Sequence, residues 1–599
     1  MRSILVVLLL FLAIEAIASV RSTNNGSNTA PMKSTRLELK VSKKGPKTTV
    51  KVTKKFRVQA KAPPRNRLSE KTSKLNVDEH SNFLSFDDIR TQVPEGFVDE
   101  YLHGPMKTLE ELFYKLLGVS SLPNEKGTRS EFATYALTDH SNDKLVYATT
   151  QELILQAGFK YENHYAQADD GYITQLVRII NPLADRKQLK QPPVALFHGG
   201  TLDTSNYVMQ STSQHHPERW PRVHGQIHTS WNRSLGFLLA NNGYDVWLVG
   251  TRGCNRANQG HRWLKKWTPL LSLNIGSSPS WMASNWEASR RYWMNYTLDD
   301  IGDKEMPRQI DRILQLTGAR RVSMLVYSIT GPPSMALLST RPEYAEKVHN
   351  YVLKGPIMSD RNAGRHLKLL WRLVSDVVSD ELGSLIIPEL ALSQPVRNLV
   401  LAIAESPLLR YTLVKLVTLI GFGSSPKFNT FLEPGLFNRV LLPASFTTLR
   451  HICKIASSGK IQRYDFGPIG NALKYGSVYA PEYDLSKMNP HNWLVVTAEN
   501  DPLNSLEDVQ KLAKTAPKKP FKHVYVKNAN HLDLTTMVEV DKEVYLPILE
   551  FLDTFQLPRH RNEPSAKFNR LQWLINRKID KELERFVPPN DRTPNGYHL

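Results

Sequence analysis

Cysteine is scarce in this chain, because its 599 residues include only Cys254 and Cys453. Two cysteines cannot form the dense disulfide framework that holds many small secreted folds together. Long apolar runs are scarce as well. The longest candidate, 396–422, is interrupted by Arg397, Glu405, Arg410 and Lys415, whereas a membrane-spanning helix needs about 20 predominantly apolar residues. The sequence therefore predicts a fold held together by packing, with no transmembrane helix in the mature chain.

The formal net charge of +20 is unevenly distributed along the chain. Residues 31–74 contain 15 Lys and Arg against 2 acidic residues, and residues 558–599 contain 9 against 5. The body between them, 75–557, is close to neutral and gives no indication of a nucleic-acid-binding fold. With 41% hydrophobic residues, the chain has enough apolar side chains for a globular protein with a sizeable core.

The N-terminus has the pattern of a secretory signal peptide over residues 1–19. Arg2 is followed by an apolar run from Ile4 to Ile14 and then by small residues. This run is too short to span a bilayer. We therefore expect the mature protein to be secreted or to lie in the endosomal or lysosomal lumen. Three Asn-X-Ser/Thr triplets become candidate glycosylation sites there, at Asn25, Asn232 and Asn295.

Both ends of the chain differ in composition from its body. Residues 20–80 form a basic extension with few large apolar side chains, which predicts disorder. Part of it, TVKVTKKFRVQAKA, alternates in polarity and could add an edge strand to a partner. Binding of a polyanion therefore stays open beside a solvated tail. Residues 81–150 are poorly defined and partly helical. Residues 558–599 form a tail with a predicted helix over 566–587, docked onto the body or onto a partner.

The region between these ends alternates short apolar strands with helical periods. The strand candidates are VALFHGG (194–200), YDVWLVG (244–250), RVSMLVYS (321–328), WLVVTAEN (493–500) and KHVYVKNANH (522–531). Strands that are separated by helices pair in parallel, so we predict an α/β fold with a doubly wound, mainly parallel sheet. Residues 361–450 are amphipathic and helical instead. They predict a helical cap inserted between two parts of the core, 151–360 and 451–557.

Three of the predicted strands are followed by residues that suit nucleophilic catalysis. Ser328, Asp501 and His531 follow strands in that order along the chain. The order Ser, acid, His at the carboxyl edge of one sheet is that of the α/β-hydrolase triad. In such a triad, the imidazole removes the serine proton and the carboxylate orients the imidazole. The sequence therefore predicts Ser328 as nucleophile, His531 as general base and Asp501 as the acid.

Several segments resemble the acid lipases of the gastric and lysosomal type. These are 151–179, with an Asp-Gly-Tyr-Ile turn at 170–173, FHGG (197–200), LGFLLANNGYDVWLVGTRG (235–253), YWMNYTLDDIGDKEMPRQID (292–311), SSGKIQRYDFG (457–467) and NHLDL (530–534). The resemblance implies an α/β-hydrolase core with a helical cap over an acyl-binding pocket, which hydrolyses neutral-lipid esters at Ser328. It also implies an oxyanion hole formed by the backbone N–H groups of Thr201 and Ile329.

The turn at the predicted nucleophile departs from the Gly-His-Ser-Gln-Gly of this family. The chain reads Val326-Tyr327-Ser328-Ile329-Thr330, followed by Gly331, Pro332 and Pro333. The family's glycines relieve crowding at a strained turn, whereas Val326 and Thr330 add branched side chains. Proline inside a helix removes a backbone donor. We therefore expect the helix to begin late, with Gly331 as its cap and Pro332 at its first position, which would move the Ile329 N–H away from the oxyanion.

Two functions of different classes follow from this turn. In the first, the widened turn still presents Ser328, and the protein is an ester hydrolase; the presence of all three triad residues favours this function. In the second, the scaffold is a non-catalytic protein for lipid binding, transport or storage. A lipid ester or fatty acyl chain is the expected ligand of both, and a lipid surface stays open as a partner. No nucleotide, redox or phosphate-binding motif indicates a cofactor.

The remaining clusters have weaker interpretations. Four histidines lie in a proline-containing loop, and no cysteine or suitably spaced carboxylate accompanies them, so a polar surface loop is preferred over a metal site. They are His215, His216, His224 and His228. The tryptophans between 263 and 293 fit ordinary packing, an acyl pocket or a lipid interface. Cys254 and Cys453 are expected to be free, buried thiols, although a bridge between them stays open.

Overall fold

The structure is a computed structural model of the chain. It describes residues 36–44, 47–55, 148–200, 202–209, 222–223, 226–227, 234–254, 260–262, 296–377, 423, 425, 427, 445–515, 520–537, 539–558 and 570–587. The chain divides into two units, Met1–Ala133 and Thr134–Leu599.

In the first unit, part of the basic extension forms a hairpin. Strand β1 (Arg36–Lys44) pairs antiparallel with β2 (Lys47–Lys55) along the full length of both strands. The sequence predicts disorder for this segment and allows only an edge strand on a partner. Alternating Leu, Val and Thr residues give both halves strand propensity, which accounts for pairing within the chain.

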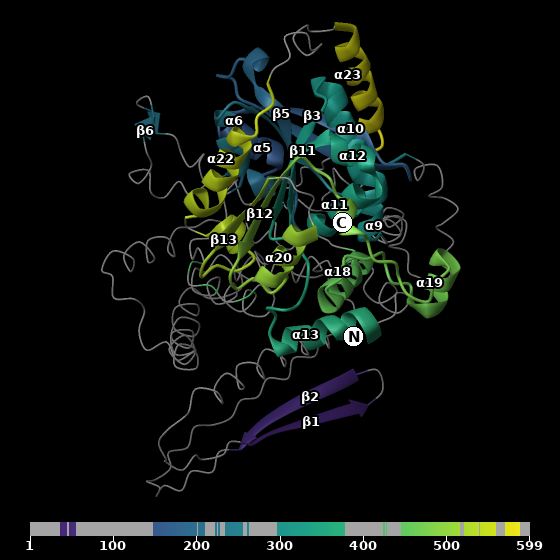
Figure 1. Ribbon diagram of the computed structural model, residues 1–599. Coiled ribbons are helices and arrows are strands. Elements are labelled where there is room, and N and C mark those ends of the chain that lie inside the picture. The colour runs from purple at the N-terminus through teal and green to yellow at the C-terminus, as the bar shows by residue number, and fades with distance from the viewer. Residues whose placement is uncertain are drawn as a thin grey trace, which may run out of the picture. The chain divides into compact units, whose positions relative to one another are not determined.

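The second unit is built around a twisted sheet of nine strands (Figure 1). Its order is β13-β12-β11-β10-β5-β8-β4-β3, and β9 pairs with β4. The strands from β13 to β8 in this order are parallel, and β4 and β3 are added antiparallel at one edge. Their bounds are β3 (Lys160–Gln167), β4 (Tyr172–Ile180), β5 (Lys190–Phe197), β8 (Tyr244–Val249), β9 (Gly260–His261), β10 (Val322–Tyr327), β11 (Val348–Lys354), β12 (Asn492–Ala498) and β13 (Phe521–Val526).

Helices cover both faces of this sheet (Figure 1). The α-helices are α5 (Thr150–Gln156), α6 (Leu235–Asn241), α9 (Leu298–Asp300), α10 (Met306–Thr317), α11 (Gly331–Thr340), α12 (Pro342–Lys347), α13 (Arg365–Arg372), α18 (Phe446–Ser458), α19 (Gly467–Tyr475), α20 (Leu506–Thr515), α21 (Asp533–Thr536), α22 (Leu546–Thr554) and α23 (Arg570–Glu584). Short turns of 3-10 or π type are η2 (Arg186–Gln188), η3 (Thr204–Tyr207), η8 (Ile301–Glu305), η9 (Ser328–Thr330), η10 (Leu373–Val377), η12 (Leu485–Lys487) and η13 (Asp541–Tyr545), and the short strands β6 (Arg222–Val223) and β7 (Gln226–Ile227) pair with each other.

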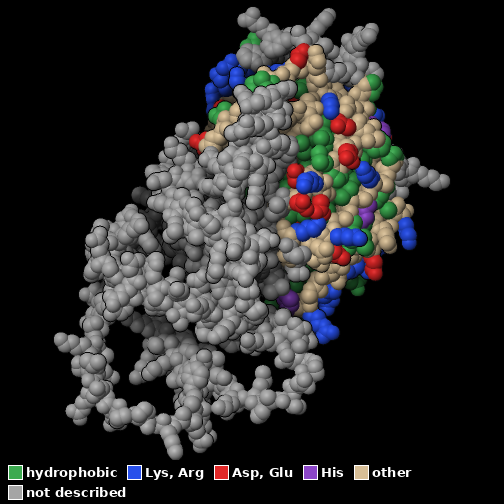
Figure 2. All heavy atoms as spheres, turned by 90° about the vertical axis from the view of Figure 1, so that its left-hand side faces the viewer, with side chains coloured by type: hydrophobic (Ala, Val, Ile, Leu, Met, Phe, Trp, Pro, Cys, Tyr) green, Lys and Arg blue, Asp and Glu red, His purple; other side chains and the backbone are tan. Residues whose placement is uncertain are grey.

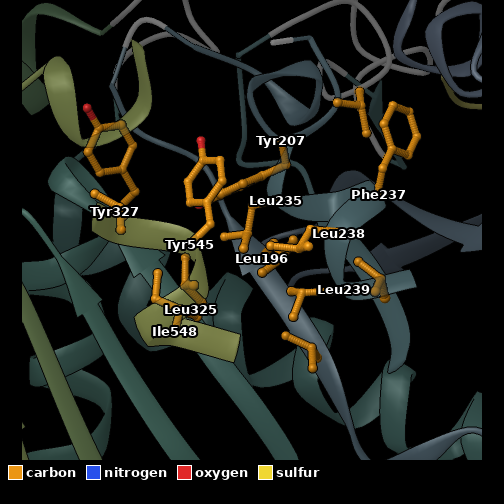
Figure 3. Packing of buried hydrophobic residues seen from close by; sticks show 14 of the residues in the cluster. Leu196, Tyr207, Leu235, Phe237, Leu238, Leu239, Leu325, Tyr327, Tyr545 and Ile548 are labelled. Carbon is orange, nitrogen blue, oxygen red and sulfur yellow. The ribbon is translucent and has the colours of Figure 1, made fainter. Parts of the chain in front are cut away.

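The buried apolar side chains form one cluster on each face of the sheet. On the first face, Leu196 and Val352 pack with residues of α5, α6 and α22 (Figure 3). On the second face, their neighbours Phe197 and Leu353 pack with residues of α10, α11 and α20. Because successive strand residues point to opposite faces, strands that are covered on both sides are apolar throughout. This explains the continuous apolar runs in the sequence.

The predicted α/β fold with a doubly wound, mainly parallel sheet is confirmed. Each of the predicted strands is present, as β5, β8, β10, β12 and β13. The sequence analysis does not identify β11, because Asn350 and Lys354 interrupt its apolar pattern. Of the predicted cap at 361–450, most residues lie outside the described part of the chain; α13 and the start of α18 are helical at its two ends.

The C-terminal helix α23 lies within the predicted helix at 566–587 and packs against the edge strand β3. Asp580 makes the central contacts: Oδ2 lies 2.8 Å from Nδ1 of His164, and Oδ1 accepts a hydrogen bond of 2.8 Å from Nη2 of Arg312. The backbone N–H of Tyr165 also donates to Oδ1, at 3.1 Å. Of the two docking sites left open by the sequence, α23 therefore occupies the one on the body.

The described surface carries charges of both signs. On the face shown in Figure 2, acidic and basic side chains are interspersed among apolar ones, in agreement with the near-neutral charge of the body. Among the described helices, none is both long and apolar enough to cross a membrane.

Candidate active site

Ser328 lies at the sharp turn between β10 and α11. Its backbone φ is 58°, in the left-handed region, which costs a non-glycine residue roughly 1–2 kcal/mol. The 3-10 turn η9, Ser328–Thr330, then leads into α11. A strained turn from strand to helix is the geometry of a nucleophile elbow, and here the turn forms without the flanking glycines.

This turn brings Ser328 next to residues from two other strand ends. Oγ of Ser328 lies 2.8 Å from Nε2 of His531, and Nδ1 of His531 lies 2.7 Å from Oδ2 of Asp501. The side chains of all three residues are buried, and Asp501 is 0% exposed. The structure therefore brings together the three residues that the sequence predicts as a triad, in the order that proton transfer from a serine requires.

Hydrogen bonds hold the carboxylate of Asp501 behind the imidazole. Oδ1 accepts from the backbone N–H of Leu503 at 2.9 Å, and Oδ2 accepts from Nδ2 of Asn504 at 2.8 Å. Asn504 is itself held, because Nδ2 also donates to the carbonyl of Pro356 at 3.2 Å. The carboxylate cannot rotate without breaking these bonds in a buried site, so the edge of the imidazole that it faces is fixed.

The imidazole of His531 is also held through its ring face. The ring of Tyr327 stacks on it, with centroids 5.4 Å apart and an interplanar angle of 15°. The Tyr327 hydroxyl donates to the His531 carbonyl at 3.1 Å. Gly355, with φ of 51°, lies so close that a Cβ there would be 3.3 Å from Cε1 of His531. These contacts restrict rotation of the ring and keep Nε2 directed at Ser328.

The loop after β5 contains the other predicted oxyanion donor. Nε2 of His198 accepts from the backbone N–H of Thr251 at 3.1 Å, so Nδ1 carries the proton and donates to the Gly199 carbonyl at 2.8 Å. Burial lowers the pKa of His198, which keeps the imidazole neutral. Thr201 itself lies outside the described residues. Ile329 is the second residue of η9, where a backbone N–H has no acceptor within the helix.

Comparison with known proteins relates this fold and site to a family. Residues 150–211 match the family described as the partial alpha/beta-hydrolase lipase region. Gastric triacylglycerol lipase of Mus musculus is 25% identical over 412 residues, which cover 67% of this chain and 90% of the relative. Lipase 3 of Drosophila melanogaster is 24% identical over 412 residues, which cover 68% and 93%. In sequence, the chain is similar to these members of the acid lipase family.

Among solved structures, a soluble variant of monoglyceride lipase from Saccharomyces cerevisiae is 12% identical to this chain. The match covers 66% of this chain and 97% of that one, with a TM-score of 0.34.

The fold accommodates branched residues where the elbow glycines are missing. Val326 is 0% exposed within the apolar cluster on the second face, and Thr330 is 0% exposed with its hydroxyl hydrogen-bonded inside the turn. The predicted late start of the α-helix is off by one residue, with Thr330 rather than Gly331 as the N-cap, and the prediction misses the 3-10 turn before it. Helix α11 begins at Gly331, with Pro332 at its second position, and the helical turn before it starts at Ser328. Both prolines fall in the first turn, where the helix requires no backbone donor.

A neighbouring glycine lets η8 approach the backbone at the start of α11 closely. A Cβ on Gly302, in η8, would lie 2.6 Å from the carbonyl oxygen of Pro333. Only glycine allows η8 to approach α11 this closely.

Three of the segments that resemble the acid lipases converge on Arg252. Its Nε donates to Oε2 of Glu305 at 2.7 Å, and Nη1 donates to Oδ2 of Asp170 at 2.8 Å. Its guanidinium lies 4.7 Å from the ring centre of Tyr172. Burial raises the pKa of Glu305 to about 7, against the opposing effect of Arg252. Because a buried carboxylate without its cation is costly, Arg252 holds these segments together rather than contacting the triad.

Several residues that the sequence singles out lie outside the described residues. These are Asn25, Asn232 and Asn295 among the glycosylation triplets, His215, His216, His224 and His228, and Trp263, Trp267, Trp281, Trp286 and Trp293. Cys254 and Cys453 are both free and buried. Within the described ranges, no group of three or more His, Cys, Asp or Glu side chains is arranged to hold a metal ion.

Lys354, at the end of β11, is a feature that sequence reasoning does not single out. Its side chain is 0% exposed, and Nζ lies 4.1 Å from the ring centre of Tyr327, the ring that stacks on His531. Nζ donates to Oγ1 of Thr535 at 2.8 Å. Burial lowers the pKa of Lys354 to about 7. The only sequence signal is a lysine at the end of an apolar run, and most such lysines extend to solvent.

Proposed function

We propose that the protein hydrolyses the carboxylic esters of neutral lipids through a Ser328–His531–Asp501 triad. The observation that carries this proposal is the 2.8 Å contact between Oγ of Ser328 and Nε2 of His531, continued by the 2.7 Å contact to Asp501. The relatives are named as triacylglycerol and other lipases, which supports fatty-acyl esters as the substrate class.

In the proposed reaction, Oγ of Ser328 attacks the ester carbonyl carbon while Nε2 of His531 takes its proton. The carbonyl oxygen becomes an oxyanion near the N–H of Ile329. When this intermediate collapses, the bond to the alcohol breaks, and His531 gives its proton to the leaving alcohol. Water, deprotonated by His531, then attacks the acyl carbon, the bond from that carbon to Oγ of Ser328 breaks, and His531 returns the proton to Oγ as the fatty acid is released. Asp501 orients the imidazole and stabilises its protonated form in both steps.

The alternative is a non-catalytic lipid-binding, transport or storage protein. Its support is the loss of both elbow glycines. The left-handed φ of Ser328 and the helical turn that begins there favour the hydrolase, because this is the geometry that presents a nucleophile and the Ile329 N–H to one substrate.

Turnover of a fluorogenic fatty-acyl ester by the purified full chain tests the proposal. We expect steady turnover by the wild type and a loss of about 1,000-fold or more in the Ser328→Ala variant. The matched control is Ser323→Ala, which removes another buried serine of β10 whose hydroxyl accepts from Asn350 at 3.0 Å. This control should retain turnover. Absence of turnover by a folded wild type would contradict the proposed hydrolase function. Lipid extracted from that inactive protein would support the alternative, a lipid-binding, transport or storage protein.

We also propose that the mature chain is secreted or lies in the endosomal or lysosomal lumen, as the N-terminal signal pattern indicates. After expression in a secretory cell, we expect the signal at 1–19 to be removed and glycosidase treatment to lower the apparent mass. A protein that retains Met1 and does not respond to glycosidase would contradict this location.

A further inference from the structure

The hydroxyl of Thr330 connects two segments. One is the turn at Ser328, residues 326–330, called the nucleophile turn, and the other is the loop after β5 that begins at His198, called the oxyanion loop. Oγ1 accepts a hydrogen bond from the backbone N–H of Tyr327 at 3.0 Å. Its single proton is within reach of two carbonyl oxygens, that of Tyr327 at 3.0 Å and that of His198 at 3.2 Å. Thr330 is 0% exposed, so water does not compete for these bonds. One buried side chain therefore links the end of β10 to the end of β5.

The contact with the His198 carbonyl holds the main chain at the start of the oxyanion loop. The peptide group that contains the His198 carbonyl also contains the N–H of Gly199, and Gly200 follows directly. The imidazole of His198 is held separately, through Nε2, by the N–H of Thr251. His198, the first residue of the loop, is thus bound by its main chain to the nucleophile turn and by its side chain to Thr251, which follows β8.

Gly200, two residues after His198, lies beside the side chain of Ile329. A Cβ at Gly200 would lie 3.4 Å from Cδ1 of Ile329, so the Ile329 side chain already fills the space beside the Gly200 backbone. The Thr330 hydroxyl and the Ile329 side chain thus contact the loop after β5 at two points, the His198 carbonyl and Gly200. Together these two contacts set the separation between the two elements that supply the oxyanion donors.

We propose that Thr330 is a positioning residue for the oxyanion hole. It occupies a place where a nucleophile elbow usually has glycine, and glycine has no atom that could bond to His198. The hydroxyl holds the loop and the Ile329 N–H at the separation that lets both face one substrate oxygen. Preorganised donors of this kind stabilise the transition state more than the bound ester. The inference rests on the proposed ester hydrolysis and assigns Thr330 a part in it.

Two substitutions distinguish the effect of the Thr330 hydroxyl from the effect of the branched shape of its side chain. Thr330→Val keeps the branched side chain but removes both hydrogen bonds, and we expect kcat on the fluorogenic ester to fall about 10- to 100-fold with KM changed less than about twofold. Thr330→Ser keeps the hydroxyl and should restore most of kcat. Thr330→Ala serves the same test if the valine variant does not fold.

A control variant and a second substrate exclude a general loss of structure. Ser334→Ala removes another buried hydroxyl of α11, which lies 2.6 Å from the Tyr351 hydroxyl; it should lower the melting temperature but leave kcat near that of the wild type. The matched thionoester has a sulfur that accepts hydrogen bonds weakly. The loss caused by Thr330→Val should therefore be smaller on the thionoester than on the ester.

The outcomes distinguish this inference from the function on which it rests. No turnover by the folded wild type overturns both. Wild-type turnover that folded Thr330→Val retains within twofold overturns only the role of Thr330. An equal loss on ester and thionoester, or a loss that Thr330→Ser does not restore, also overturns that role, because either result means that the substitution disturbs Ser328 or the packing instead.

Discussion

Replacing Lys354 with methionine tests the electrostatics behind the imidazole of His531. The lysine is fully buried, and its Nζ donates to Thr535 at 2.8 Å and to the Leu534 carbonyl at 3.5 Å. In the described part of the chain, no salt bridge reaches Nζ. Three tyrosine rings lie around it, those of Tyr327, Tyr207 and Tyr545, at 4.1, 5.5 and 5.8 Å from Nζ.

The cost of charging Lys354 follows from its lowered pKa. The pKa falls from an ordinary value of 10.5 to about 7 because of burial. At about 1.4 kcal/mol for each pKa unit, holding the charge in the folded state costs about 5 kcal/mol. Methionine has a similar length and no charge. Its substitution loses a hydrogen bond worth about 1–1.5 kcal/mol and some attraction to the rings, so we expect Lys354→Met to be more stable than the wild type at pH 6, by about 3 kcal/mol.

This gain must depend on pH, and its direction is fixed by proton uptake. Between pH 7 and 10.5, the unfolded lysine binds a proton that the folded lysine has lost, so the free energy of unfolding of the wild type rises with pH. Below pH 7 both forms are protonated, and the full penalty remains. From pH 6 to pH 9, the advantage of Lys354→Met should therefore shrink by about 2.5 kcal/mol.

Reversible unfolding in guanidinium chloride, at pH 6 to pH 9, measures this difference for both proteins. Fluorescence reports on the sheet through Trp247 and Trp493, which are both 0% exposed. A constant difference between variant and wild type over this range would refute the reasoning, because it would mean that Lys354 does not change its protonation. A variant that is less stable than the wild type at pH 6 would refute the magnitude.

Three further predictions concern the triad and the C-terminal helix. Asp501→Asn should lower kcat on a fluorogenic ester by about 10,000-fold with the fold intact, because the amide favours the wrong tautomer of His531. The control Asp508→Asn, which changes another buried carboxylate, should leave kcat near that of the wild type. Equal losses of kcat in the two variants would contradict this prediction. Gly355→Ala places a Cβ 2.9 Å from Leu534 and 3.3 Å from His531 at a φ of 51°, so kcat should fall about 10-fold and stability by about 1–2 kcal/mol; unchanged kinetics and melting temperature would disprove it. Burial lowers the pKa of His164, but hydrogen bonds to Asp580 and Glu162 outweigh burial and raise it, so docking of α23 is stabilised below the ordinary pKa of histidine and weakens as pH rises through the raised pKa. Limited proteolysis should therefore cut α23 faster at pH 8 than at pH 5.5. A cleavage rate that does not depend on pH in the wild type, or that Asp580→Asn leaves unchanged, would argue against this.

The positions of the predicted triad could be inferred from the sequence because the fold follows from a simple pattern. Continuous apolar runs separated by helical periods indicate parallel strands, and parallel strands have their carboxyl ends at one edge. Ser328, Asp501 and His531 each follow such a run, so their proximity follows from the topology. Strand β11 does not follow this pattern. Its Asn350 and Lys354 are satisfied by Ser323 and Thr535, residues far away in sequence.

The details of the elbow could not be inferred, because they depend on the direction of individual side chains. From the sequence, Thr330 adds only bulk at a crowded turn. In the structure its hydroxyl bonds to the backbone of Tyr327 within that turn and is 3.2 Å from the carbonyl of His198, after β5. The start of α11 likewise depends on Gly302, which admits Pro333 from another helix. Local sequence does not show that such a distant residue leaves space.

Covalent labelling of the wild type by a fluorophosphonate tests the central claim most directly, since this probe reacts with a serine only when a neighbouring base activates it. Intact-mass measurement and peptide mapping of the full chain should show one phosphonyl group, attached to Oγ of Ser328, and no label in the folded Ser328→Ala and His531→Ala variants. A folded wild type that takes up no probe, or takes it up at another residue, would contradict the account.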